Sequence, residues 1–141
     1  MIGLGYVGLP LAVGLSRHFS VVALDIDETR VSELSKGHDR TGEMTPESLR
    51  VADLRLTSSA SEIAACSIHI VTVPTPVGTD HVPNLEAVQL ACELVGGQLK
   101  GGDIFVLEST VYPGATEEIC VPILEKEFKS YIGMHEIPIV H

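Results

Sequence analysis

Residues 1–12 read MIGLGYVGLPLA, and this stretch decides the fold. Gly3, Gly5 and Gly8 follow the spacing G-x-G-x-x-G directly after a short apolar segment. In a nucleotide-binding fold the first glycine makes a tight turn, the second lets the backbone approach a pyrophosphate, and the third lets a helix pack closely on a strand. Backbone N–H groups at the start of that helix then face the phosphates. Three spaced glycines can equally form a plain structural turn, so the motif needs support from the rest of the chain.

An acidic residue at the expected distance gives that support. Asp25 closes the apolar segment SVVALD, residues 20–25, and lies 22 residues after Gly3. A carboxylate at the end of a second strand can hydrogen-bond the ribose hydroxyls of adenosine, and it would repel a 2′-phosphate, so the order of elements predicts NAD rather than NADP. In the simpler interpretation Asp25 only caps the next helix. Arg30 could lean toward the ribose or be a solvated charge.

Apolar segments alternate with segments of helical period along the chain, which is typical of repeated β-α-β units and a parallel sheet. We expect a doubly wound α/β Rossmann fold with strand order 3-2-1-4-5-6. Its first strand is short, because only Met1–Leu4 are available where about five or six residues are usual. The predicted strands are 2–4, 20–25, 54–59, 67–73, 104–110 and one in the tail 130–141, and the main helices are 7–18, 28–36, 85–99 and 115–128. Two short helices are expected after Thr45 and after Ser59 or Ser61.

Composition excludes several classes of function. The 141 residues fit one domain with a real hydrophobic core. The formal net charge of -10, from 19 acidic residues against 9 Lys and Arg, disfavours nucleic acid and anionic membrane surfaces as partners. No apolar stretch approaches the roughly 20 residues that cross a bilayer, and no leader peptide is indicated. We therefore expect a soluble, cytoplasmic protein.

The cysteines and histidines indicate neither disulfides nor a metal site. Cys66, Cys92 and Cys120 are odd in number, widely spaced and set among apolar residues, so we expect buried free thiols. The six histidines form no spacing typical of metal ligands, and we predict no bound metal.

Three further loops carry candidate residues. Thr75 in VPTP and Thr110 in STVYPG follow the fourth and fifth predicted strands, and open α/β sheets bind ligands at the carboxyl ends of their strands. Each threonine could line a cofactor groove or serve ordinary turn chemistry. The segment GHDRTGE, residues 37–43, is longer than a simple helix-to-strand connection requires.

Several stretches together resemble a known family. IGLGYVGLPLA, DIDETRVSEL, GHDRTGE, VTVPTPV, LESTVYPGATEE and VPILE occur in the order seen in the N-terminal domain of the UDP-glucose/GDP-mannose dehydrogenase family, over roughly residues 1–130. GHDRTGE, VPTPV and ESTVYPG are most similar to the branch that oxidises UDP-N-acetylhexosamines for surface polysaccharides.

The resemblance implies NAD-dependent oxidation of a sugar C6 alcohol to a carboxylate, in two hydride transfers with a cysteine-bound intermediate. By position, the cofactor-binding residues it implies are Gly3, Gly5, Tyr6, Val7, Gly8, Asp25, Arg30, Thr75 and Thr110. The glycines would hold the pyrophosphate, Asp25 and Arg30 the adenosine ribose, and Thr75 the neighbouring cofactor edge. Thr110 would lie near the nicotinamide and the reacting carbon, where it helps to order a water.

The chain also departs from the family pattern. A serine-proline-glutamate-arginine segment normally follows the sixth strand, whereas this chain reads YIGMHEIPIVH, and Glu136 is one residue out of phase. The family's nucleophilic cysteine, lysine and asparagine have no counterpart here. We therefore expect residues 1–141 to be the NAD-binding domain of a longer homo-oligomeric nucleotide-sugar dehydrogenase, inactive alone, whose UDP-sugar substrate binds through other domains. The alternatives are an NAD-dependent dehydrogenase of the hydroxyacid or 6-phosphogluconate type, and an inactive nucleotide-binding or interaction module.

Overall fold

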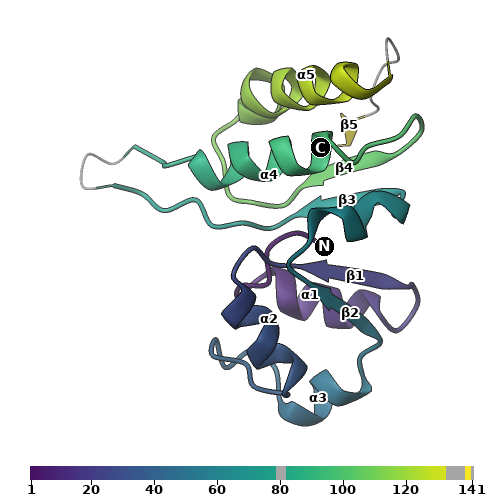
Figure 1. Ribbon diagram of the computed structural model, residues 1–141. Helices are drawn as coiled ribbons and strands as arrows, with labels where there is room; N and C mark the ends of the chain where they lie inside the picture. The colour runs from purple at the N-terminus through teal and green to yellow at the C-terminus, as the bar shows by residue number, and fades with distance from the viewer. Residues whose placement is uncertain (79–81, 133–138, 141) are drawn as a thin grey trace.

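The computed structural model describes residues 1–78, 82–132 and 139–140, and it is an α/β fold with parallel strands (Figure 1). The strands are β1 (Val21–Leu24), β2 (Leu54–Thr57), β3 (Ile68–Val71), β4 (Ile104–Leu107) and β5 (Ile139–Val140). The helices are α1 (Gly8–Leu15), α2 (Glu28–Ser35), α3 (Pro46–Val51), α4 (Glu86–Gly96) and α5 (Val121–Ile132), with a 3₁₀ helix at Ala60–Ala65 and a π-helical segment at Thr116–Cys120. Strand and helix alternate as the sequence predicts.

The strands form two parallel groups that meet at Ile2. β1 pairs with β2, and β3 pairs with β4, which in turn pairs with β5. Ile2 bridges Leu24 of the first group and Val71 of the second, both in parallel. Its N–H donates to the Ile70 carbonyl at 2.8 Å and its carbonyl accepts from the Thr72 N–H at 2.8 Å. The first strand, predicted over residues 2–4, is therefore shorter than expected: it is reduced to the bridging residue Ile2.

Helices cover the strands on two faces. Adjacent strand residues point to opposite faces, and they divide into two core clusters. Met1 and Ala23 join the cluster of α1 and α2, while Ile2 and Leu24 join the cluster of α4 and α5. Figure 1 shows α5 lying along α4, outside β3 and β4.

Two helices differ from the prediction for local reasons. The helix predicted over 7–18 ends as α1 at Leu15, because Ser16 donates its hydroxyl to the Val13 carbonyl and the chain tightens into turns. The helix predicted over 115–128 is a π-helical segment followed by α5. Pro122 has no N–H for the carbonyl four residues earlier, and a wider π turn accommodates this gap.

The other predicted elements are present within shorter bounds, although Ser59 precedes the 3₁₀ helix without a capping hydrogen bond from its side chain. Thr45 caps α3 by accepting from the Ser48 N–H at 3.1 Å. The predicted sixth strand is represented by β5, whereas Glu136 lies outside the described residues. No helix in the described part of the chain has the length and apolar character needed to cross a membrane.

The three thiols are free, as expected. Cys92 and Cys120 are buried together between α4 and the π-helical segment, whereas Cys66 is only half-buried. A hydrogen bond with the Cys120 sulfur, together with burial, raises the pKa of the Cys92 thiol, and the same hydrogen bond lowers the pKa of the Cys120 thiol.

Candidate cofactor site

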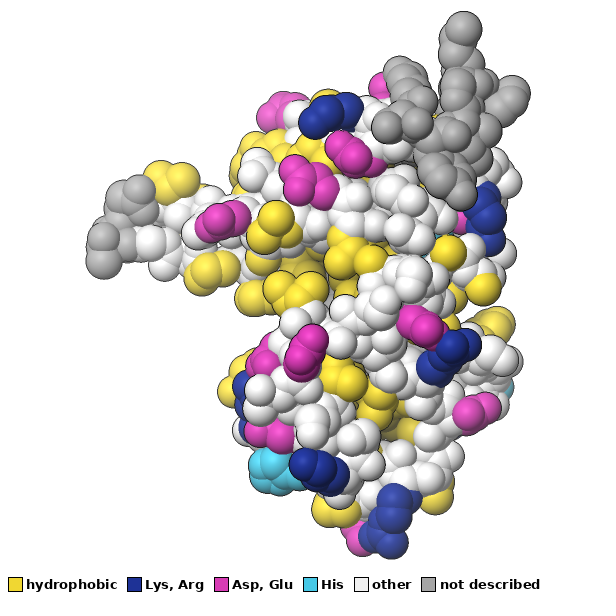
Figure 2. All heavy atoms as spheres, in the orientation of Figure 1, with side chains coloured by type: hydrophobic (Ala, Val, Ile, Leu, Met, Phe, Trp, Pro, Cys, Tyr) yellow, Lys and Arg dark blue, Asp and Glu magenta, His cyan; other side chains and the backbone are white. Residues whose placement is uncertain are grey.

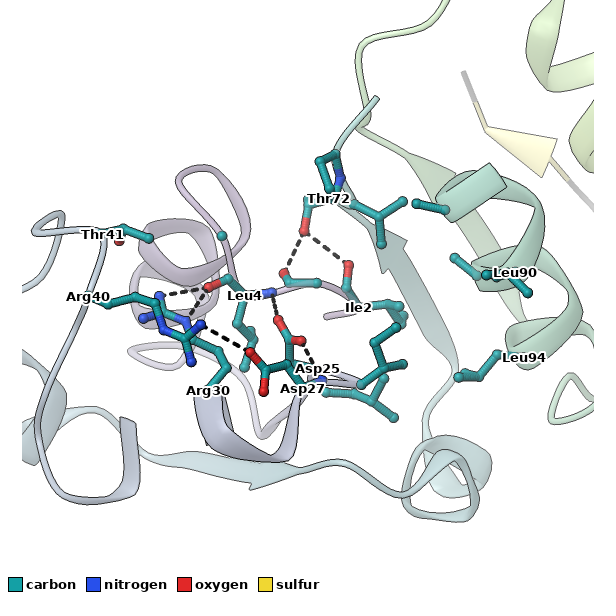
Figure 3. Close-up of a pocket in the computed structure, with 18 residues that line it drawn as sticks. Ile2, Leu4, Asp25, Asp27, Arg30, Arg40, Thr41, Thr72, Leu90 and Leu94 are labelled. Carbon is teal, nitrogen blue, oxygen red and sulfur yellow. Dashed lines mark hydrogen bonds and ion pairs between the residues drawn. The ribbon is translucent and has the colours of Figure 1, made fainter. Parts of the chain in front are cut away.

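A cavity of about 570 Å³ opens where the two strand groups meet. Its walls come from the glycine turn, the end of β1, the segment after β3 and one face of α4 (Figure 3). These are the carboxyl ends of parallel strands on either side of the Ile2 bridge, which is where open α/β sheets bind ligands.

The three glycines of the turn meet three different steric demands. Gly3 has φ 90°, and a Cβ there would lie 3.1 Å from the Thr72 carbonyl oxygen. A Cβ on Gly8 would lie 1.9 Å from the Gly3 carbonyl oxygen, so the start of α1 packs directly on the turn. A Cβ on Gly5 would meet no atom within 4 Å, and Gly5 lines the cavity. Only at Gly5 does the missing side chain leave open space that a ligand can use.

The start of α1 has no side-chain cap. Val7 is its N-cap residue and makes no side-chain cap hydrogen bond, while in the first turn the Leu9 N–H donates to the Gly5 carbonyl at 3.3 Å and Pro10 has no N–H. An uncapped helix start presents backbone N–H groups and the positive end of the helix dipole. Tyr6 and Val7 are exposed beside it and, like Gly8, do not line the cavity.

Asp25 fastens the glycine turn to the end of β1. Its Oδ2 accepts from the Leu4 N–H at 2.8 Å and its Oδ1 accepts from the Asp27 N–H at 3.0 Å. The cap of α2 is Asp27, which accepts from the Thr29 N–H, so the interpretation of Asp25 as a helix cap is wrong. Asp25 lines the cavity next to Gly5.

Arg30 is buried beneath the turn, so the solvated-charge interpretation is also wrong. Its Nε and Nη2 donate to the Leu4 carbonyl at 2.9 and 2.8 Å, and Nη2 lies 2.7 Å from Asp39 Oδ1. Its Nη1 is buried without a partner among the described residues. Arg30 thus supports the turn from below while it lines the cavity.

Asp39, in the GHDRTGE segment, completes this support and was not singled out in the sequence. Its side chain is fully buried. Burial alone would raise the pKa of Asp39, but hydrogen bonds from the Thr41 hydroxyl, Arg30 and two backbone N–H groups lower it to about 2. The segment is longer than a connection needs because it brings a charged partner to Arg30.

A second guanidinium, that of Arg40, lies at the cavity rim. Its Nη1 is 3.0 Å from Asp27 Oδ2 and its Nε is 2.5 Å from Glu33 Oε2. A hydrogen bond from the backbone of Arg30 contributes most to lowering the pKa of Asp27. A hydrogen bond to Glu33 raises the pKa of Arg40, so Asp27 and Arg40 both favour their charged forms.

The two candidate threonines contact each other outside the cavity. The Thr75 hydroxyl donates to the Thr110 carbonyl at 2.6 Å, and neither residue lines the cavity. The Ser109 hydroxyl likewise donates to the Val73 carbonyl at 2.7 Å. These bonds fasten the loop after β3 to the loop after β4 and continue the edge of the site along the sheet.

Other residues of the site were missed by sequence reasoning. The Thr72 hydroxyl donates to the Gly3 carbonyl at 2.8 Å and closes the turn from β3. Ile26 and Leu90 line the cavity with 73% and 51% of their surfaces exposed. Figure 2 shows hydrophobic side chains gathered between the part of the molecule that carries α4 and the part that carries β1 and α2. The spacing of Ala87, Leu90, Ala91 and Leu94 was the available signal, because it gives α4 a second apolar stripe.

The whole chain, residues 1–141, matches the model of the UDP-glucose/GDP-mannose dehydrogenase family, NAD binding domain. The chain belongs to this family. It is 48% identical over 127 residues to the UDP-N-acetyl-D-glucosamine 6-dehydrogenase of Pseudomonas aeruginosa and 50% identical over 127 residues to that of Salmonella typhi. Each alignment covers 89% of this chain and 30% of the relative.

A solved structure from the same family shows the same fold. The UDP-glucose dehydrogenase of the archaeon Pyrobaculum islandicum superposes with a TM-score of 0.85 at 29% identity, over 98% of this chain and 33% of that one. The chain therefore spans about a third of its full-length relatives and corresponds to their NAD-binding part. The resemblance seen in the sequence is confirmed, and the family match excludes the hydroxyacid and 6-phosphogluconate alternative.

Proposed function

We propose that residues 1–141 form the NAD-binding domain of a longer nucleotide-sugar 6-dehydrogenase, and that this enzyme oxidises the C6 alcohol of a UDP-N-acetylhexosamine to the uronate with two NAD. The cavity at the Ile2 bridge carries the proposal, because Gly5 with its open space and Asp25 both line it, beside the uncapped start of α1. The identities of 48% and 50% with UDP-N-acetyl-D-glucosamine 6-dehydrogenases favour that sugar class over UDP-glucose.

The described residues fit the parts of NAD. The pyrophosphate would lie over Gly5 and the start of α1, beside Tyr6 and Val7, where an added side chain would find open space. The adenosine ribose would meet Asp25, whose two oxygens are already oriented by backbone N–H groups. With Nε and Nη2 of Arg30 committed to Leu4 and Asp39, Nη1 is the guanidinium nitrogen left for this end.

The apolar walls of the cavity suit the adenine ring. Ile26 flanks it from the end of β1, and Leu90 and Leu94 flank it from α4. Aliphatic side chains and few polar groups are typical of pockets that bury a ring. Bound NAD would accept hydride from the sugar.

Thr110 is proposed to act at the other end of the cofactor. The hydrogen bond from Thr75 holds the Thr110 backbone and leaves the Thr110 side chain exposed beyond the cavity. There Thr110 would position a water near the nicotinamide, with Thr75 at the neighbouring cofactor edge. The cysteine nucleophile and the UDP-sugar contacts are assigned to other domains of the complete enzyme, so residues 1–141 alone would bind cofactor without oxidising sugar.

We extend the proposal to the strand order of the sheet, the oligomeric state of the complete enzyme and its cellular compartment. When Ile2 is counted as the first strand, the observed pairings run β2-β1-Ile2-β3-β4-β5. These pairings support a doubly wound sheet of order 3-2-1-4-5-6. The complete enzyme is proposed to be a homo-oligomer. Three free thiols favour a reducing compartment, and hence the cytoplasm.

Calorimetric titration with NAD, NADP and UDP-N-acetylglucosamine tests the proposal. We expect measurable NAD binding, weaker NADP binding and no binding of the sugar nucleotide. Asp25→Asn keeps an oxygen for the Leu4 N–H and removes the charge, so it should weaken NAD about tenfold and narrow the preference over NADP, since one good charged hydrogen bond is worth about 1.5–3 kcal/mol. Asp53→Asn, outside the cavity, is the matched control. Tight sugar-nucleotide binding, or equal affinities before and after the Asp25 change, would contradict the assignment.

A further inference from the structure

The adenosine end of the cavity contains two guanidinium groups with different freedom to move. Arg30 is buried and committed to Leu4 and Asp39. Arg40 lines the same cavity with 42% of its side chain exposed. Only its ion pairs with Asp27 and Glu33 hold it in place among the contacts described for its side chain. Figure 3 shows Arg40 beside Arg30, joined to Asp27 at the mouth of the site.

These ion pairs are not needed to hold the segment in which Arg40 lies. Asp39, the preceding residue, already anchors it through Arg30, the Thr41 N–H and hydroxyl, and the Met44 N–H. Exposed ion pairs stabilise a fold by only about 0–1 kcal/mol. A function in the site accounts better for a guanidinium clamped by two carboxylates at the rim.

The two ion pairs of Arg40, with Asp27 and with Glu33, determine how the rim of the cavity would interact with the 2′-phosphate of NADP. A free guanidinium near a ribose is a strong bidentate partner for a 2′-phosphate. Here both donor edges in use, Nη1 and Nε, point at carboxylates. A 2′-phosphate would therefore meet Asp25 and Asp27 in the cavity wall and an Arg40 already paired with Asp27 and Glu33, and the like charges would repel it.

We propose that Asp27 and Glu33 hold Arg40 between them in a three-residue cluster of net negative charge, and that this clamp, in addition to the charge of Asp25, makes the site reject NADP. The inference rests on the proposed NAD site and adds three specificity-determining residues to it. Release of Arg40 would convert the rim into a phosphate-binding position.

The ratio of the dissociation constants for NADP and NAD, measured by calorimetry, tests the clamp. Asp27→Asn keeps a side-chain oxygen for the Thr29 N–H and so preserves the cap of α2. We expect Glu33→Gln to lower the ratio about threefold and Asp27→Asn/Glu33→Gln to lower it tenfold or more, with the gain lost at high salt. Adding Arg40→Gln should return the ratio to the wild-type value or above it.

Glu47→Gln is the matched control, because it breaks the exposed Arg50 ion pair on α3 away from the cavity. Its ratio should equal that of the wild type, and thermal melts verify that each variant is folded. A ratio unchanged within twofold in the double variant, while the wild type binds NAD, would overturn the clamp and leave the proposed function standing. A wild-type chain that binds neither dinucleotide would overturn both.

Discussion

The Arg30–Asp39 pair shows how single residues support the candidate site from inside. Both side chains are buried, and the pair lies directly beneath the Leu4 carbonyl of the glycine turn. Removing one partner of a buried ion pair leaves an uncompensated charge, which costs about 3–5 kcal/mol. We therefore expect Asp39→Asn to lower the free energy of unfolding by about 3 kcal/mol in urea denaturation.

An exposed ion pair provides the control for this prediction. Arg55 and Glu62 form an ion pair with an exposed arginine, so Glu62→Gln should cost under about 1 kcal/mol. Similar losses for both variants would show that the buried pair stabilises the fold no more than an exposed one.

Because the pKa of Asp39 is lowered from 3.8 to about 2, its contribution to the free energy of unfolding is present above pH 3.8 and is lost as the pH falls toward 2.

Sequence reasoning identified Asp25 as a residue of the site but did not identify the partners of Arg30. The distance from Gly3 to Asp25 is fixed by a β-α-β unit, so Asp25 could be predicted from local periodicity. The partners of Arg30 lie 26 residues before it and nine residues after it along the chain. No periodicity links such positions, and the direction of a guanidinium depends on burial that only the folded chain supplies.

At the scale of elements, α1 and the turn before it contain two glycines with opposite roles. A Cβ added at Gly8 would clash with the Gly3 carbonyl oxygen, whereas a Cβ added at Gly14 would meet no atom within 4 Å. We expect Gly8→Ala to destabilise the domain by about 3 kcal/mol and to abolish NAD binding, because the start of α1 must move off the turn. Thermal melting and dinucleotide titration of the purified variant measure both effects.

Gly14→Ala is the comparison within the same helix. An alanine in a helix interior is favoured over glycine by about 0.5–1 kcal/mol, so this variant should melt at a higher temperature and keep its affinity for NAD. Loss of binding in both variants would mean that any change in α1 disturbs the site, and the specific packing argument would fail.

Element order was predictable from the sequence, while the shape of individual elements was less so. Alternating apolar and helical segments predicted every described strand, since parallel strands buried on both faces are continuously apolar. The π-helical segment before Pro122 was not predicted, because a proline near a helix start is equally compatible with a regular first turn. The apolar stripe of Leu90 and Leu94 was not identified as a cavity wall, because periodicity cannot distinguish a core face from a cavity wall.

At the scale of the whole molecule, His69 makes stability depend on pH. It is 1% exposed in β3, with Nε2 3.4 Å from Asp103 Oδ2. Burial lowers the pKa of His69 below 6.5, with smaller effects from the N-terminal amine and Lys100, although Asp103 opposes the shift. The unfolded chain therefore binds the proton more tightly, and stability falls as the pH drops below 6.5.

Urea denaturation between pH 7 and pH 5.5 measures this slope. We expect a loss approaching about 1 kcal/mol per pH unit, and His69→Gln should flatten it. His18→Gln, at an exposed position, should retain the slope. A slope unchanged by His69→Gln would assign the acid sensitivity to other groups.

The Ile2 bridge has a consequence for how this domain persists in a cell. The cavity walls come from both strand groups, with Gly5 and Asp25 on one side and Val73 and Leu94 on the other. A dinucleotide that contacts both sides would add non-covalent contacts between the two strand groups, which Ile2 bridges in the sheet. By mass action, ligand at 100 times its dissociation constant stabilises the folded state by about 2.7 kcal/mol. We therefore expect bound NAD to stabilise the folded domain as well as to equip it for chemistry, and the domain without cofactor to open first between the two strand groups.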